Sequence, residues 1–138
     1  MAELIINGKS YKLNFKFKNF IDYRNLFNAD FFTDIEYLFQ KNLNFIRELP
    51  SEIQDKFLNQ KELNNVQFND LIKIKNSNSF DLSDYVKISQ LLYVLIDSDK
   101  KYEDWFDTLE FLPNREILIS IYTLFQESQK NTIEIKKN

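Results

Sequence analysis

The dipeptide Asn7-Gly8 constrains this chain most, because it favours a two-residue type I′ turn between two β-strands. Gly8 is the only glycine among the 138 residues, and it stands where the backbone needs a positive φ angle. The turn sets the register of a hairpin over residues 3–17, and this register pairs Ile6 with Lys9, Leu4 with Tyr11, and Ala2 with Leu13. Alternation along the strands then separates two faces: Leu4, Ile6, Tyr11, Leu13, Phe15 and Phe17 on one, and Ser10, Lys12, Asn14 and Lys16 on the other. Because an isolated hairpin is marginal in water, the apolar face needs a helical layer or another subunit to cover it.

Helical spacing of apolar residues follows the hairpin directly. A short helix over roughly residues 19–27 would present one face made of Phe17, Phe20, Ile21, Arg24 and Phe27. After a break at residues 28–30, Thr33 and Glu36 have the spacing of a capping box. The helix that they open would carry Ile35, Leu38 and Phe39 on one face and reach Arg47 or Leu49, because Pro50 disfavours a helical residue before it.

Residues 51–80 carry the weakest pattern. Ser51-Glu52 is a plausible helix start, with Ile53, Phe57 and Leu58 facing inward. The segment from Val66 to Ile74 fits a short helix or an edge strand, and we favour the helix. Residues 75–79 form a polar loop that would tolerate insertions.

Two broadly apolar helices dominate the second half. Asp81 would cap a helix to about Ile96, whose stripe contains Leu82, Tyr85, Val86, Ser89, Leu92 and Ile96, widened by Ile88, Leu91 and Leu95. A helix that is apolar nearly all round belongs at the centre of a domain. A helix over 102–111 would then turn four side chains inward: Tyr102, Trp105, Phe106 and Leu109. Pro113 would end it, and Asn114 would cap the last helix, 114–128.

These elements predict an α+β fold that is mostly α: an N-terminal hairpin followed by a bundle of about five helices. Residues 1–128 would form a single domain, and the polar residues 129–138 would form a frayed tail. Repeats and sustained heptads are absent, which argues against solenoids and coiled coils.

Composition removes most catalytic chemistry. The chain has no His and no Cys, so Ser-His-Asp or Cys-His triads, disulfides and the usual zinc shells are impossible. A single glycine also excludes the Gly-rich loops that cradle phosphates. Asp97 and Asp99 superficially open a calcium loop, but Tyr102 and Thr108 stand where that loop needs Gly and Glu. We therefore expect no enzyme, no metal and no cofactor.

Charge and hydropathy bear on partners and location. The net charge of −3 gives no global field toward nucleic acid. Lysines do interleave with aromatics near the N-terminus, but alternation puts the rings of Tyr11 and Phe15 on the core face and Lys12 and Lys16 on the wet face. The longest apolar run, 91–96, is far too short to cross a membrane, and no signal peptide is evident. We expect a soluble, cytoplasmic protein that binds neither nucleic acid nor membrane; nucleic-acid binding stays a third hypothesis.

The N-terminal pattern also carries a family resemblance. The pattern is three apolar residues, Asn-Gly-Lys, then Tyr11, Leu13, Phe15 and Phe17, followed by an aromatic helix containing Phe20, Ile21 and Leu26. This opening resembles tail assembly chaperones of long-tailed phages (siphophage type) of Gram-positive hosts. The resemblance implies a non-enzymatic factor in the host cytoplasm. Such a factor would bind the tape measure protein, keep it in solution and help tail tube subunits polymerise around it. Its expected partners are the tape measure protein and the tail tube protein, with homo-oligomers left open.

Surplus apolar surface is the feature that fits a protein-binding role. Phe31-Phe32 and Trp105-Phe106 are adjacent aromatic pairs, and neighbours on a helix cannot face the same way, so one member of each pair is a candidate for exposure. The candidate partner-binding residues are Phe31, Phe32, Trp105, Phe106, Ile121 and Phe125. The alternative interpretation is that all six are core residues with no role in binding. The alternative function is a small phage-type protein-interaction or inhibitor module that acts on a host protein.

Overall fold

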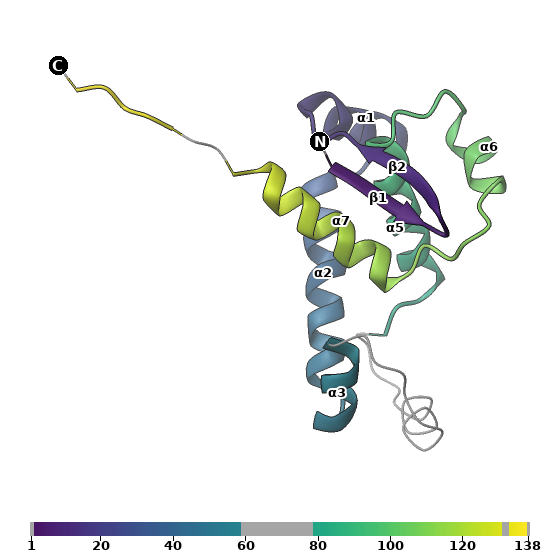
Figure 1. Ribbon diagram of the computed structural model, residues 1–138. Coiled ribbons are helices and arrows are strands. Elements are labelled where there is room, and N and C mark those ends of the chain that lie inside the picture. The colour runs from purple at the N-terminus through teal and green to yellow at the C-terminus, as the bar shows by residue number, and fades with distance from the viewer. Residues whose placement is uncertain (1, 59–78, 131–132, 138) are drawn as a thin grey trace.

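The computed structural model describes residues 2–58, 79–130 and 133–137 (Figure 1). It has an antiparallel hairpin followed by helices, which confirms the predicted α+β, mostly α class. The strands are β1 (Ala2–Ile6) and β2 (Lys9–Leu13). Six helices lie in the described residues: α1 (Phe17–Phe27), α2 (Phe31–Arg47), α3 (Ser51–Leu58), α5 (Leu82–Leu95), α6 (Tyr102–Asp107) and α7 (Arg115–Ser128). The predicted features between residues 59 and 78 lie outside the described residues.

The turn chemistry produces the predicted hairpin register. Asn7 and Gly8 both have positive φ angles, 51° and 79°. Ile6 pairs with Lys9, Leu4 with Tyr11, and Ala2 with Leu13. The second strand is shorter than predicted, because β2 ends at Leu13. Phe17 therefore does not belong to the hairpin's apolar face; it begins α1 with 75% of its surface exposed.

Helix α5 occupies the centre of the fold, as its nearly continuous apolar surface predicts. It packs against β2, α1, α2, α6 and α7. Its side chains at Ile88, Leu91, Leu92 and Leu95 are fully buried. Leu82 was predicted to lie in the same stripe, and this was wrong: it occupies the first position of α5 and is 76% exposed, whereas the first buried residue of the helix is Asp84.

Caps decide where the helices begin. The predicted caps Asp81 and Asn114 are confirmed, since their side chains accept hydrogen bonds from the backbone N–H groups of Asp84 and Ile117. The predicted capping box at Thr33 is wrong. Asp30 caps α2 instead, and its carboxylate accepts hydrogen bonds from both the backbone N–H (2.9 Å) and the hydroxyl (2.6 Å) of Thr33. The Thr33 hydroxyl, followed by its backbone N–H, lowers the pKa of Asp30 below its ordinary value.

Two further boundaries and faces differ from the prediction. Helix α6 ends at Asp107, well before Pro113, so the proline does not terminate it. On α1 the buried residues are Asn19, Phe20 and Tyr23, whereas Ile21 is exposed. The face was misplaced because Asn19, a polar residue, occupies one of the most buried positions of the helix.

The core joins the hairpin to most of the helices. One cluster runs from Leu13 through Tyr23, Ile35 and α5 to Trp105 and α7. A second, smaller cluster joins the end of α2 to α3 and consists of Phe45, Ile46, Leu49 and Ile53. In Figure 1 the smaller cluster's elements lie at the end of α2 that is farthest from the hairpin. After α7, Ile133 and Ile135 are exposed and lie in neither a helix nor a strand.

Candidate functional site

Each adjacent aromatic pair splits between core and surface. Phe31 is buried and Phe32 is 40% exposed; Trp105 is buried and Phe106 is 37% exposed. Phe31 and Phe32 lie in the first turn of α2, because Asp30 caps that helix. The exposed members, Phe32 and Phe106, lie on different helices, α2 and α6.

The other candidate residues are core residues. Ile121 and Phe125 face inward from α7, one turn apart, and both are buried. Together with Phe31 and Trp105 they support the fold from within rather than forming a surface, because the inner face of α7 is the face that packs against α2 and α5. Of the six candidates, therefore, only Phe32 and Phe106 are accessible.

Phe32 is the exposed edge of an aromatic cluster. Its ring centroid lies 4.8 Å from that of Phe20 and 5.9 Å from that of Phe125. Phe31 lies beneath, 4.8 Å from Phe20 and 5.8 Å from Phe125. Such tilted and edge-to-face aromatic contacts stabilise the fold by more than the burial of the rings alone. The cluster fixes the Phe32 ring from below and leaves its outer side open to a partner.

Helix α1 adds apolar surface that the sequence reasoning assigned to the core. Phe17 and Ile21 are four residues apart, so they lie on the same side of the helix, and both are exposed. The sequence does contain this i, i+4 apolar pair. Its exposure was not predicted, because Asn19 is buried and α1 is therefore oriented with the pair facing outward. Asn19 donates hydrogen bonds to the Val94 carbonyl (2.8 Å) and to the Asp97 carboxylate (2.9 Å).

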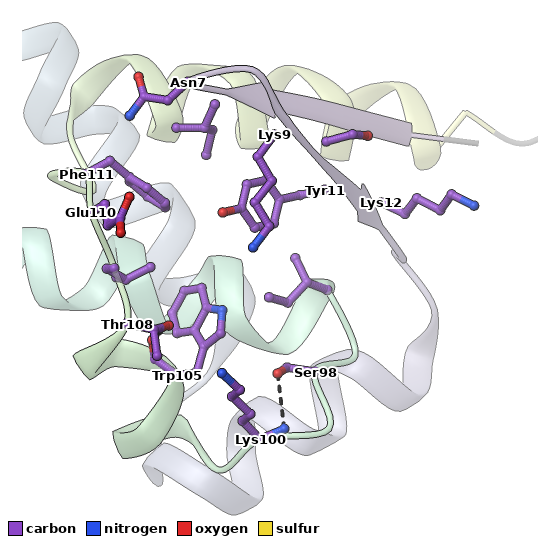
Figure 2. A pocket seen from close by; sticks show the side chains of 14 residues that line it. Asn7, Lys9, Tyr11, Lys12, Ser98, Lys100, Trp105, Thr108, Glu110 and Phe111 are labelled. Atoms are coloured by element: carbon purple, nitrogen blue, oxygen red, sulfur yellow. Dashed lines mark hydrogen bonds between the residues drawn. The ribbon is translucent and has the colours of Figure 1, made fainter.

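A second feature is a hollow of about 790 Å³ between the hairpin and the segment around α6 (Figure 2). Its volume is in the range of ligand-binding cavities. The residues that line it are Ile6, Asn7, Lys9, Ser10, Tyr11, Lys12, Ile96, Ser98, Lys100, Trp105, Thr108, Leu109, Glu110 and Phe111. Figure 2 shows the side chains of Lys9 and Tyr11 pointing into the hollow from β2, with Trp105 facing them from the other side, whereas the Lys12 side chain points away.

Aromatic contacts hold the walls of this hollow. Tyr11 meets Phe111 edge-on at 6.3 Å, and the Lys9 ammonium lies 5.3 Å from the centroid of the Tyr11 ring. Trp105 packs against Tyr93 at 5.4 Å, and the Tyr93 hydroxyl donates to the Lys100 carbonyl. Burial, with a smaller contribution from the charge of Glu103, raises the pKa of Tyr93 above its ordinary value. The Tyr93 hydroxyl, which supports Trp105 and the Lys100 backbone, is therefore protonated at neutral pH.

No family model, curated protein or solved structure matches the chain. Within residues 2–58, 79–130 and 133–137, no helix is long and apolar enough to span a membrane. In the same described ranges, His, Cys, Asp and Glu side chains form no group of three that could hold a metal ion.

Proposed function

We propose that this protein is a phage tail assembly chaperone, a non-enzymatic factor of the host cytoplasm that binds the tape measure protein and aids tail tube assembly. The observation that supports the proposal best is the exposure of three apolar side chains, Phe32 on α2 and Phe17 and Ile21 on α1. The ring centroid of Phe32 lies 4.8 Å from that of Phe20, which places Phe32 beside α1. The N-terminal hairpin, with its Asn7-Gly8 turn and aromatic helix, agrees with the family resemblance.

The chemistry of this surface suits a long helical partner. Tape measure proteins are expected to be long and helical, and an amphipathic helix binds through apolar side chains spaced by three or four residues. Rigid aromatic side chains that are already held in place lose little conformational entropy on binding. The net charge of −3 would help to keep the complex in solution.

Co-expression with the longest helical protein encoded just downstream tests the proposal. We expect a soluble complex that co-elutes in size-exclusion chromatography. The substitutions Phe17→Ser and Phe32→Ser should abolish co-elution while circular dichroism shows an intact fold. Leu82→Ser is the matched control, because Leu82 is an apolar side chain at least as exposed as Phe17 and Phe32 and lies on a different helix, and it should leave the complex intact.

The outcome also separates the alternative function. A folded, solitary protein beside an insoluble tape measure protein would contradict the chaperone proposal. The exposed Phe17 and Phe32 would then be better explained by an interaction module that binds a folded host protein. A bacterial two-hybrid screen with Phe32→Ser as the negative control would test that alternative directly.

A further inference from the structure

Strand β2 has an outer edge with open backbone groups. In an antiparallel hairpin, successive residues of one strand point their N–H and C=O groups alternately toward the partner strand and outward. A two-residue turn makes Ile6 and Lys9 a hydrogen-bonded pair. The backbone N–H and C=O groups that point outward from β2 therefore belong to Ser10, Lys12 and Asn14. The Asn14 N–H donates to the Leu95 carbonyl of α5 at 2.8 Å, which agrees with this alternation. Across the described part of the chain, no hydrogen bond joins the backbone of Ser10 or Lys12 to any element outside the hairpin.

This open edge borders the hollow of about 790 Å³. Both Ser10 and Lys12 contribute to its lining, although the Lys12 side chain points away, so Lys12 meets the hollow through its backbone (Figure 2). The opposite wall consists of Trp105 and the segment from Thr108 to Phe111. The result is a trough with hydrogen-bonding backbone on one side and aromatic side chains on the other.

The trough carries positive charge. The charged side chains that point into it are Lys9 and Lys100, against one lining carboxylate, Glu110. Lys9 and Lys100 approach the hollow from opposite sides, Lys9 from β2 and Lys100 from the α5–α6 connection (Figure 2). An occupant with regularly spaced carboxylates would therefore complement the site.

We propose that this trough binds an acidic, extended segment of a partner protein, which adds to β2 as a third strand. Its backbone pairs with the outward N–H and C=O groups of Ser10 and Lys12, and its acidic side chains meet Lys9 and Lys100. The edge is closed at Asn14, so the added strand is short, about three or four residues. This inference is independent of the tape measure proposal, which uses Phe17 and Phe32, two residues that do not line the trough.

Two other occupants fit less well. A small anion would use the N–H groups and lysines but would leave the outward carbonyls of Ser10 and Lys12 without donors, whereas a strand satisfies both kinds of group. A second copy of the chain would bring its own Lys9 and Lys12 to the same edge, and like charges facing each other disfavour such pairing. An acidic segment avoids both problems.

Trp105 makes the test direct, because it is the only tryptophan in the chain and it lines the trough. The probe is an end-blocked peptide of about six residues in which glutamate and valine alternate, matching the two-residue period of a strand. We expect a saturable change in Trp105 emission that weakens as salt is added. The same peptide with lysine in place of glutamate, or with proline in place of the central valine, should produce no saturable change.

Two pairs of variants identify the binding mode. Ser10→Pro removes an outward N–H of β2, whereas Ile5→Pro removes the equivalent outward N–H on the opposite edge of the same hairpin, since Ile5 pairs with Ser10. Ser10→Pro should weaken binding about tenfold and Ile5→Pro should not. Similarly, Lys9→Glu should weaken binding about tenfold, whereas Lys130→Glu, at an exposed position after α7, should leave it unchanged.

Clear results would overturn the proposal. Equal binding by Ser10→Pro and the parent protein would exclude strand addition. Complete displacement of the peptide by free glutamate at the same total carboxylate concentration would show a simple anion site instead. Binding of the lysine peptide as tightly as the glutamate peptide would remove the charge argument.

Discussion

The ammonium group of Lys41 lies 2.6 Å from the Asp84 carboxylate, and the two side chains are only 11% and 3% exposed. This ion pair joins α2 to the first turn of α5, where Asp84 also accepts the backbone N–H of Asp81. Burial lowers the pKa of Lys41, but the hydrogen bonds to Asp84 and Tyr37 outweigh burial, so the pKa lies above its usual value. Lys41 is therefore charged at neutral pH.

Removal of one partner should be costly. Lys41→Met leaves the Asp84 charge buried without its counter-charge, so we expect a loss of about 3 kcal/mol in the free energy of unfolding. The double variant Lys41→Met, Asp84→Asn should recover part of that loss, because no buried charge remains. Urea unfolding of the parent, the two single variants and the double variant gives the coupling. Lys18→Met breaks exposed ion pairs with Asp22 and Asp97 and is the control that should change little. A similarly small effect of Lys41→Met would show that water screens the buried pair.

A second prediction concerns alkaline pH. Burial, followed by the hydrogen bond that Tyr23 donates to Asp34 at 2.5 Å, raises the pKa of Tyr23 above its ordinary value of 10.0. The folded state therefore holds this phenol proton more tightly than the unfolded state does. Its contribution to stability is complete below pH 10 and decreases as the pH rises above that value.

Tyr23→Phe tests this dependence. We expect a loss of about 1 kcal/mol at neutral pH, where the hydrogen bond disappears, and a shallower decrease in stability above pH 10. Lys41, whose raised pKa acts in the same direction, leaves a residual slope. Urea midpoints measured between neutral pH and the onset of alkaline unfolding would provide the slopes. An unchanged slope in Tyr23→Phe would mean that the tyrosine ionises as freely in the folded state as in the unfolded state.

The burial of the Asn19 amide could not be predicted from the sequence, whereas the turn and two of the helix caps could. The Asn7-Gly8 turn dictates its own register, and Asp81 and Asn114 are caps whose role follows from local chemistry. All three were predicted correctly, because each depends on residues adjacent in sequence. The burial of Asn19 depends on hydrogen bonds to Val94 and Asp97, which lie far along the chain. No local sequence pattern indicates those partners. The polar residue therefore looked like a surface residue, and the face of α1 was misplaced.

The candidate surfaces were likewise predictable only where they depend on neighbouring residues in the sequence. The sequence indicated that one member of each aromatic pair could be exposed, but the choice between Phe31 and Phe32 depends on the Asp30 cap and on contacts with Phe20 and Phe125. The trough beside β2 could not be predicted, because it forms only where the hairpin approaches Trp105 and Phe111 from the other end of the sequence.

Asn19→Ala should therefore destabilise the fold more than the same substitution at an exposed polar position of a helix. It removes the hydrogen bonds to the carbonyl of buried Val94 and to the carboxylate of exposed Asp97, and leaves the Val94 carbonyl without this donor, so we expect a loss of about 2 kcal/mol. Asn25→Ala, on the exposed side of α1, is the matched control and should stay within about 0.5 kcal/mol of the parent. Thermal unfolding compares the two. Equal stability of the two variants would show that the Asn19 bonds are no stronger than those it makes with water.

The turn itself provides a fourth prediction. Gly8 has a φ angle of 79°, and a Cβ atom there would meet nothing within 4 Å. Gly8→Ala should thus cost only the backbone strain of a positive φ angle, about 1 kcal/mol. Asn7→Gly, at the neighbouring positive φ angle, should be tolerated. Chemical unfolding measures both variants, and a neutral Gly8→Ala would indicate that the turn changes type at little cost.

The most direct test of the proposed function is the affinity of the purified protein for the longest helical protein encoded just downstream of it. This affinity would be measured for the parent, for the combined variant Phe17→Ser, Phe32→Ser, and for Leu82→Ser. Our account predicts that the parent and Leu82→Ser bind equally well and that the combined variant binds at least about tenfold more weakly, since aromatic anchors dominate such interfaces. Equal affinity of all three proteins, or no binding by the folded parent, would contradict the account.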